Sequence, residues 1–312
     1  MSQVIATSPD GTKFPFLLHD KQDQFISERI RQRGSWEPFE TRVMLSLLNR
    51  GDVVVDIGAN IGWYTIALAL QIGESGRVFA FEPEPDNADL LEQSVALNRL
   101  SNVRLFRCAL SESPGTLQLI KSVTNMGDHR VSTLPSGQLQ GIDVPVDTLD
   151  RLVASGAVDL KRARIVKIDT QGAEVLVLRG ARNAFANLTD TCAVFVEFSP
   201  NLLRQHGNDF PQHFLDVLHT LARDIYLINA RYRTLHRVTQ TELHGFAATC
   251  IGGSDDAGVD LILAPHNDKT LDRFCRFYAP LVKSKVLPSM GSSSSVSATA
   301  ARTHAIGADR LQ

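Results

Sequence analysis

The stretch DVVVDIGANIGWYTIALAL, residues 52–70, decides the fold of this chain. Its first part, Asp52 to Asp56, holds three consecutive valines, and such a β-branched run is typical of a strand buried on both faces of a parallel sheet. Gly58 and Gly62 then allow a tight turn and a close backbone approach, and residues 65–70 are typical of a helix. A strand, a glycine turn and a helix in this order predict a ligand at the turn.

The same alternation continues along the chain. We predict further strands at 78–83, 103–110, 164–169 and 193–198, and helices at 38–49, 86–99, 149–155 and 174–186. This pattern indicates an α/β fold with a doubly wound, mostly parallel sheet. Between the third and fourth strands, LQLIK, RVSTL and IDVPVDTL predict a β-rich insertion, which typically shapes a substrate site.

Three regions follow from this pattern. Residues 1–36 are expected to form an N-terminal cap or lid, with a short hairpin around Pro9 to Gly11 and a charged helix at 21–33. Residues 37–287 form the α/β domain. Its last part is predicted as a helix at 211–223 and the strands DIYLINA and VDLILAP, which a loop at 231–258 separates. Residues 288–312 are rich in Ser, Ala and Gly and predict a disordered tail.

The amino-acid composition limits which binding partners and which cellular compartment we expect for this protein. The 32 basic and 34 acidic residues give a net charge of −2, so we expect neither a nucleic-acid nor a membrane partner, and the number of subunits stays open. Four cysteines lie far apart without a CxxC pair, which argues against a zinc site or disulfides and favours reduced thiols in a cytoplasm. The N-terminus shows no basic start with an apolar run, so we expect no export signal.

The residues after the first strand separate two ligand classes. A dinucleotide fingerprint, G-x-G-x-x-G, needs a second glycine where this chain has Asn60. The pattern here is D-x-G-x-x-x-G, which begins at Asp56 at the end of the strand. A carboxylate there would repel a pyrophosphate but can accept hydrogen bonds from an ammonium group. S-adenosylmethionine carries such a group and a sulfonium cation, so it is the predicted cofactor.

Two more positions fit a nucleoside. Glu82 ends the second strand, where its carboxylate can accept hydrogen bonds from ribose hydroxyls. Dinucleotides and S-adenosylmethionine share this feature, so it predicts the pocket without choosing the cofactor. Ala109 follows the third strand among small and apolar residues that suit a purine. The cofactor-binding residues predicted here are therefore Asp56, Gly58, Asn60, Gly62, Glu82 and Ala109.

At this point the chain resembles the FkbM family of S-adenosylmethionine-dependent methyltransferases. The motifs are VVDIGANIGWYT at 54–65, FAFEPEP at 79–85, GDHRV at 127–131 and IVKIDTQGAEVLVLRGA at 165–181. The resemblance implies a class I methyltransferase domain of Rossmann-like type. It also implies O-methylation of a small-molecule hydroxyl acceptor such as a sugar, polyketide or other secondary metabolite. Gln171 stands where glutamate is common in the family, so a role for that carboxylate is in doubt here.

Three residues are candidates for handling the acceptor's proton. Asp169 ends the fourth strand, Glu197 ends the fifth, and His129 lies in the insertion beside Asp128. The same three could hold a divalent metal, although we expect none. Arg231 and its neighbours Arg233 and Arg237 favour a solvated face or an anionic acceptor. Two other readings remain open: a module that binds the cofactor without catalysis, and an NAD-dependent oxidoreductase.

Overall fold

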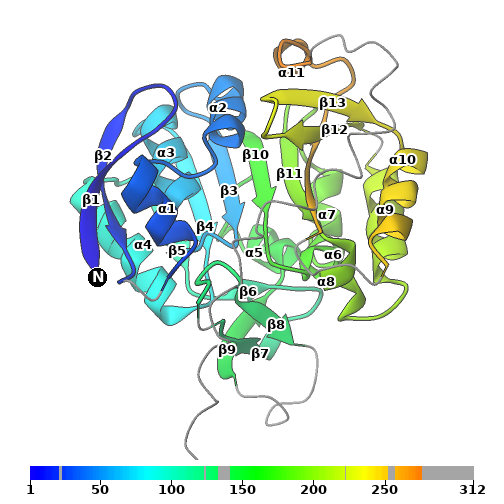
Figure 1. The fold of residues 1–312 in the computed structure, drawn as a ribbon, viewed down its shortest axis with the longest axis horizontal. Coiled ribbons are helices and arrows are strands. Elements are labelled where there is room, and N and C mark those ends of the chain that lie inside the picture. Colours follow the sequence, from blue (N-terminus) through cyan, green and yellow to red (C-terminus); the bar gives the residue numbers. More distant parts are fainter. Residues whose placement is uncertain (21–22, 123, 133–140, 222, 252–256, 276–312) are drawn as a thin grey trace, which may run out of the picture. The chain divides into compact units, whose positions relative to one another are not determined.

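A mixed sheet of eight strands forms the centre of the fold (Figure 1). Five neighbouring strands are parallel: β5 (Val103–Phe106), β4 (Arg77–Phe81), β3 (Val53–Ile57), β10 (Ala163–Ile168) and β11 (Ala193–Phe198). Beyond β11 the order continues with β14 (Val259–Ala264), β12 (Asp224–Asn229) and β13 (Thr234–Val238), all paired antiparallel. The predicted α/β fold with a mostly parallel sheet is confirmed.

The order of the strands locates the ligand site. From β3 the chain adds β4 and β5 on one side, and then returns to add β10 and β11 on the other. The sheet therefore has a switch point between β3 and β10. In open α/β sheets ligands bind outside the carboxyl ends of the strands at such a point.

The computed structural model describes residues 1–20, 23–122, 124–132, 141–221, 223–251 and 257–275. The predicted tail at 288–312 lies outside these residues, and so does part of the insertion. Contacts group residues 1–277 into one unit. Within the described ranges, no helix has both the length and the apolar character needed to cross a membrane.

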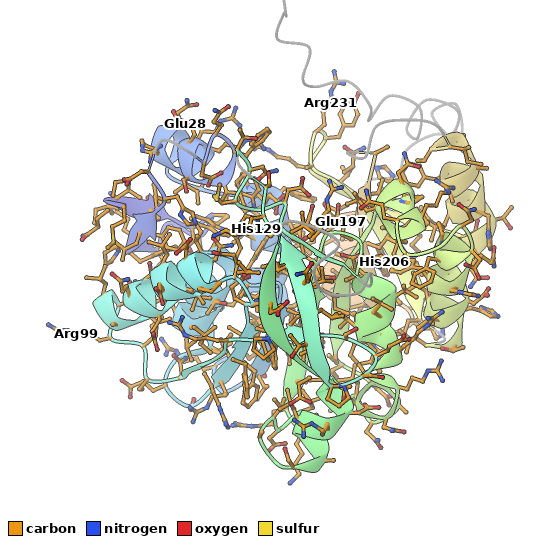
Figure 2. All side chains as sticks on the ribbon, turned by 90° about the horizontal axis from the view of Figure 1, so that it is seen from below. Glu28, Arg99, His129, Glu197, His206 and Arg231 are labelled. Atoms are coloured by element: carbon orange, nitrogen blue, oxygen red, sulfur yellow. The ribbon has the colours of Figure 1, made fainter. Side chains whose placement is uncertain are left out.

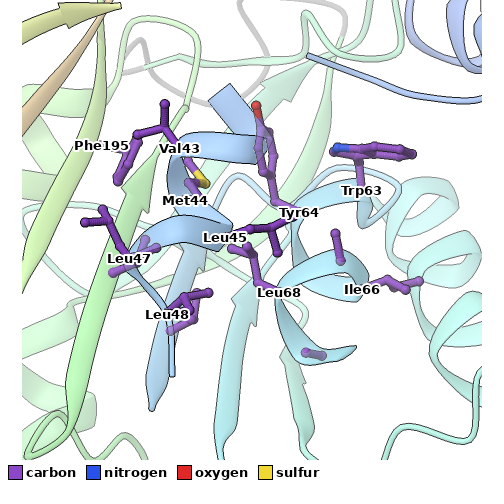
Figure 3. Packing of buried hydrophobic residues seen from close by; sticks show 14 of the residues in the cluster. Val43, Met44, Leu45, Leu47, Leu48, Trp63, Tyr64, Ile66, Leu68 and Phe195 are labelled. Atoms are coloured by element: carbon purple, nitrogen blue, oxygen red, sulfur yellow. The ribbon is translucent and has the colours of Figure 1, made fainter. Parts of the chain in front are cut away.

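One face of the sheet is covered by α2 (Pro38–Leu47), α3 (Trp63–Ile72) and α4 (Pro85–Leu97). In Figure 3, Val43 and Met44 of α2 lie beside Phe195 of β11, and Leu68 of α3 joins the same apolar cluster. Eight of the ten residues of α3 are buried, which explains why its sequence is apolar on all sides. This packing fixes the glycine turn that precedes α3.

The N-terminal segment contributes to this core. The predicted hairpin is present as β1 (Ser2–Thr7) and β2 (Lys13–Leu18), which pair antiparallel. Phe14 and Phe16 are buried, and their ring centroids lie 5.7 and 5.9 Å from that of Trp63. The following helix, α1 (Ile26–Arg33), begins five residues later than predicted, because the Asp23 carboxylate accepts hydrogen bonds from the backbone of residues 25 and 27 and holds a turn there.

The predicted strand at 103–110 was wrong in its second half. It breaks after Phe106, and β6 (Ala109–Leu110) joins a separate sheet with β9 (Ile142–Asp147). That sheet has the order β6-β9-β7-β8 and includes β7 (Gly115–Ile120) and β8 (Arg130–Ser132). The predicted β-rich insertion is therefore present. Pairing with a distant strand outweighed the continuous local β propensity.

Two further predictions were wrong. The helix predicted at 174–186 is divided into α6 (Glu174–Arg179) and α7 (Arg182–Ala186) at Gly180, where a Cβ would lie 1.9 Å from the Ser111 carbonyl oxygen. The loop predicted at 231–258 contains β13 and α10 (Gln240–Thr249), whose N-terminus carries a Thr239 to Glu242 capping box. The remaining helices are α5 (Leu149–Ala154), α8 (Pro200–Arg204), α9 (Phe210–Thr220) and α11 (Lys269–Asp272).

Candidate functional site

A pocket lies at the carboxyl ends of β3, β4 and β10, at the switch point of the sheet. The turn after β3 contributes Gly58 and Asn60, and the end of β4 contributes Glu82. The insertion and the small sheet form the opposite wall. Residues from these segments and from the turn after β10 also line the pocket, among them Cys108, Ala109, Leu110, Leu119, Met126, Gly127, His129, Val131, Asp169 and Thr170.

The glycine turn has a backbone that its sequence explains. Gly58 has φ +80°, and a Cβ there would lie 1.8 Å from the Asp169 carbonyl oxygen, so only glycine fits. Asn60 also has a positive φ, and its side-chain oxygen accepts a hydrogen bond from the Ile61 backbone at 2.8 Å. Its amide nitrogen donates to the Met126 carbonyl oxygen at 2.7 Å. Asn60 therefore ties the insertion to the turn.

Glu82 lies where a ribose-binding acid was predicted. One of its oxygens accepts from the Asn60 backbone at 2.7 Å, and the other accepts from the Glu84 backbone at 2.9 Å. Burial raises the pKa of Glu82 to about 7. Each carboxylate oxygen can accept a second hydrogen bond, so this side chain can receive two hydroxyl groups from the pocket.

Two of the predicted cofactor residues lie behind the pocket and do not line it. The Asp56 carboxylate accepts a hydrogen bond from the Thr65 hydroxyl at 2.6 Å and is 1% exposed. Its other oxygen has no partner among the described residues, and burial raises its pKa. Gly62 faces α4, where a Cβ would lie 2.7 Å from the Leu91 side chain. These two residues hold α3 against its neighbours.

Ala109 lines the end of the pocket that is richest in apolar side chains. Cys108 and Leu110 flank it, and Leu119 and Val131 of the small sheet face the same space. Ala109 is positioned by β6, which pairs with β9 and not with β4. This end of the pocket has the small, apolar character that suits a purine.

His129 also lines the pocket, and Figure 2 shows it close to the small sheet. Its Nδ1 atom accepts a hydrogen bond from the Ser122 backbone at 3.1 Å, so a neutral ring carries its proton on Nε2. Burial lowers the pKa of His129, which favours this neutral ring. The Nε2 atom is buried and has no partner among the described residues. His129 therefore lines the pocket with a neutral ring whose buried Nε2–H has no partner among the described residues.

Asp169 and Glu197 are brought together by Gln171. The Gln171 amide nitrogen donates to Asp169 at 2.8 Å and to Glu197 at 3.0 Å, and Gln171 has φ +54°. Asp169 also accepts from the Lys167 ammonium at 2.7 Å, and Glu197 accepts from the Ser199 hydroxyl at 2.6 Å. Gln171, which stands where glutamate is common in the family, thus places a neutral amide donor between the carboxylates of Asp169 and Glu197.

His129 and the Asp169–Glu197 pair have different charged neighbours. The charges that most affect His129 are those of Glu84 and Lys121. Those that most affect Asp169 are Lys167 and its hydrogen-bonded neighbours. In the described part of the chain, no group of three or more His, Cys, Asp or Glu side chains is arranged to hold a metal ion.

Several charged residues near Asp169 were missed by sequence reasoning. Lys167 is 4% exposed in the middle of the sheet, and its ammonium lies 4.7 Å from the centre of the Tyr64 ring. The Tyr64 hydroxyl donates to Glu37 at 2.6 Å. Asp260 lies opposite Glu197 in the β11–β14 pair. A lysine inside the apolar run RIVKID was the available signal, because a buried charge in a strand requires a partner.

The fold and the pocket together define an α/β protein with a pocket at the switch point of its sheet. A comparison with family models matches residues 56–227, more than half of the chain, to the Methyltransferase FkbM domain. The chain therefore belongs to the FkbM family of methyltransferases, as the sequence motifs predicted.

Curated proteins with related sequences are also methyltransferases by name. The hexuronic acid methyltransferase AglP of Haloferax volcanii is 33% identical over 148 residues, which cover 47% of this chain and 57% of AglP. The methyltransferase sdnD of Sordaria araneosa is 30% identical over 155 residues, which cover 41% of this chain and 59% of sdnD. The chain thus matches less than two thirds of the length of these relatives.

Proposed function

We propose that this protein transfers a methyl group from S-adenosylmethionine to a hydroxyl group of a small metabolite. The observation that carries this proposal is the position of Asp169. Asp169 lines the pocket, and its carboxylate shares the Gln171 amide donor with Glu197. An acceptor that contacts this pair would lie next to the reactive end of the cofactor. The relative AglP, named for a hexuronic acid, is consistent with a sugar-like acceptor.

The residues of the pocket fit this cofactor. Glu82 would accept hydrogen bonds from the ribose hydroxyls, and the apolar end around Ala109 would hold the adenine. The unpartnered Nε2–H of His129 would donate to the bound nucleoside. When bound, S-adenosylmethionine supplies a methyl group on a positively charged sulfur. The chain contributes the position of that methyl group relative to the acceptor, which can account for much of the rate acceleration.

Asp169 is the residue that we assign to the acceptor hydroxyl. Burial alone would raise its pKa, but Lys167 and Gln171 hold that pKa below its ordinary value, so the carboxylate is ionised and can accept the hydroxyl hydrogen. Burial and the nearby Asp169 charge raise the pKa of Glu197 well above its ordinary value. Glu197 is therefore the stronger base of the pair once it is ionised. Methyl transfer would form the C–O bond as the C–S bond of the sulfonium breaks, and the hydroxyl proton would pass to this carboxylate pair.

The test is a mass-spectrometric assay of the purified protein with S-adenosylmethionine and fractions of small metabolites from its host. We expect S-adenosylhomocysteine together with a product that is one methyl group heavier. Calorimetry with S-adenosylmethionine and with NADH serves as the control. Binding of NADH alone would overturn the proposal, and binding of S-adenosylmethionine without product in every fraction would favour a non-catalytic binding module.

A further inference from the structure

One side of the pocket is formed by the N-terminal segment, which precedes the residues that match the family model. Ile26, the first residue of α1, lines the pocket together with Asn60 and Glu82. The family match begins only at residue 56. Two earlier residues contact other parts of the lining, and we call the three residues the N-terminal wall: His19, Asp23 and Ile26. The motifs of the family therefore leave this side of the pocket unexplained.

Ile26 packs against Gly127, a residue of the insertion that also lines the pocket. A Cβ on Gly127 would lie 2.4 Å from the Ile26 Cδ1 atom, so a side chain at position 127 would displace Ile26. Ile26 is half-buried, whereas Ile30, one turn further along α1, is fully buried in the core. One helix thus presents one isoleucine to the pocket and another to the core.

Asp23 joins the N-terminal segment to the insertion. Its buried carboxylate accepts hydrogen bonds from the backbone N–H groups of residues 25 and 27, at 3.2 and 2.7 Å, and from that of Met126 at 3.4 Å. The Met126 carbonyl oxygen accepts from the side-chain amides of Asn60 at 2.7 Å and Asn87 at 3.2 Å. Groups from the N-terminal segment, the glycine turn and α4 therefore hold Met126 at the pocket.

His19 acts on the pocket through Asn87. Its Nε2 atom lies 2.6 Å from the Asn87 side-chain oxygen, and because that oxygen can only accept, the His19 Nε2–H is the donor. Asn87 is 1% exposed and lines the pocket. It is also one of the hydrogen-bonding groups that favour the ionised carboxylate of Glu82. His19 thus fixes a side chain that lies against the predicted ribose-binding acid.

We propose that the N-terminal wall covers the ribose of the bound nucleoside: Ile26 contacts the sugar, and His19 and Asp23 are positioning residues that hold Asn87 and Met126 in place. This inference rests on the proposed function, in which Glu82 accepts the ribose hydroxyls. The partners of the wall surround Glu82 and not the apolar end of the pocket in the small sheet. An apolar side chain over these hydrogen bonds excludes water and strengthens them.

The first arm of the experiment compares the two isoleucines of α1. Calorimetry with S-adenosylhomocysteine should show roughly tenfold weaker binding in Ile26→Ala, the order expected when several apolar carbons lose contact with a ligand. Ile30→Ala is the matched control: it should lower the unfolding temperature further, because Ile30 is fully buried, and leave affinity within about twofold. Should Ile30→Ala fail to fold, Ile26→Val and Ile30→Val make the same comparison with one methyl group.

The second arm tests the positioning residues with adenosine and 2′,3′-dideoxyadenosine, which lacks the ribose hydroxyls. His19→Ala should weaken adenosine binding by roughly threefold or more and leave dideoxyadenosine binding unchanged, because the variant releases the group beside Glu82. His19→Gln should restore the difference, since its amide can donate to Asn87. His266→Ala, which removes a hydrogen-bonded histidine from an exposed site, is the control. Asp23→Ala should speed hydrogen exchange in residues 124–127, whereas the exposed Asp20→Ala should not.

Two results would overturn the proposal while the proposed function stands. Unchanged S-adenosylhomocysteine affinity in a folded Ile26→Ala protein would remove Ile26 from the cofactor site. Equal losses of adenosine and dideoxyadenosine affinity in His19→Ala, without rescue by His19→Gln, would mean that His19 only stabilises the fold.

Titration of the wild type with NADH separates this inference from the proposed function. If the wild type bound NADH and not S-adenosylhomocysteine, the proposed function would fail. The Ile26 and Ile30 variants titrated with NADH would then decide whether the N-terminal wall contacts the nucleoside. If the wild type bound none of the nucleoside probes, both proposals would be overturned.

Discussion

The pocket shares Asp169 with a second set of carboxyl side chains, which we call the acidic cluster: Glu37, Glu40, Asp169, Glu197 and Asp260. In the pocket, Glu82 accepts hydrogen bonds from two backbone N–H groups that its own loop and the neighbouring turn provide. In the cluster, burial and the charges of neighbouring carboxyl groups raise the pKa of Glu40 and Asp260. The pocket acid is thus held by backbone donors, whereas Glu40 and Asp260 of the cluster are held by burial in their protonated forms until the pH rises. Four predictions test this contrast.

The largest effect, on turnover, is expected at Asp169, which the pocket and the acidic cluster share. Asp169→Asn removes the carboxylate that would orient the acceptor and receive its hydrogen, so turnover should fall by roughly 10²–10⁴-fold, the usual range for general-base catalysis. The S-adenosylmethionine affinity should stay within about threefold. Single-turnover rates and calorimetry measure the two quantities. If turnover remained within threefold of the wild type, simple positioning would account for the reaction.

A loss of affinity is expected in the pocket. Glu82→Ala removes the acceptor of the ribose hydroxyls, so S-adenosylmethionine binding should weaken by about 1.5–3 kcal/mol, the scale for hydrogen bonds to a charged group. Calorimetry on the folded variant measures this, with Glu92→Ala as a control for losing an exposed acid from the next helix. Unchanged affinity in a folded Glu82→Ala protein would remove Glu82 from the cofactor site.

The pocket and the acidic cluster also differ in how far their residues could be predicted from the sequence. Gly58, Asn60 and Glu82 follow strand ends whose buried, β-branched runs are visible locally, so the pocket could be located from two short motifs. The acidic cluster could not. Glu40 in the first turn of a helix is favoured by the helix dipole alone, and Asp260 stands in an apolar strand without a sign of its neighbour. Only the pairing of β14 with β11 brings Asp260 to Glu197.

The break in the predicted third strand follows the same reasoning. Residues 103–110 have continuous β propensity, and no local residue marks the point at which the chain leaves the large sheet. The position of Ala109 in the small sheet depends on β9, more than 30 residues further along the chain. The predicted helix likewise divides at Gly180, which packs on the backbone of Ser111, a residue remote in sequence. Long-range contacts of this kind override local propensity.

A smaller effect is expected on stability, and its sign follows from the raised pKa of Asp260. In the unfolded chain an aspartate titrates near pH 4, whereas burial raises the pKa of Asp260 to about 7 in the folded protein. Between these values the unfolded state binds fewer protons than the native state, so the free energy of unfolding falls as the pH rises. It should fall between pH 4.5 and 8 in the cofactor-free protein.

Urea denaturation at several pH values measures this fall. In Asp260→Asn the decrease should be smaller by on the order of 2 kcal/mol, because one pKa unit corresponds to about 1.4 kcal/mol and the groups of the cluster titrate together. The exposed Asp89→Asn is the control. An identical decrease in Asp260→Asn and the wild type would mean that the charge of Asp260 is balanced within the free protein.

The smallest effect is expected at His129. This residue could act as a hydrogen-bond donor in the pocket or as the base for the acceptor. His129 lines the pocket, its buried Nε2–H has no partner among the described residues, and its charged neighbours, Glu84 and Lys121, are not those of Asp169. His129→Ala should therefore weaken S-adenosylmethionine binding by about 0.5–1.5 kcal/mol, the net value of one neutral hydrogen bond, and leave turnover at saturating cofactor within threefold. Calorimetry and saturation kinetics across pH 5.5–9 measure both effects. A tenfold loss of turnover together with loss of the acidic limb of the pH profile would instead make His129 the base, as its place in the sequence first suggested.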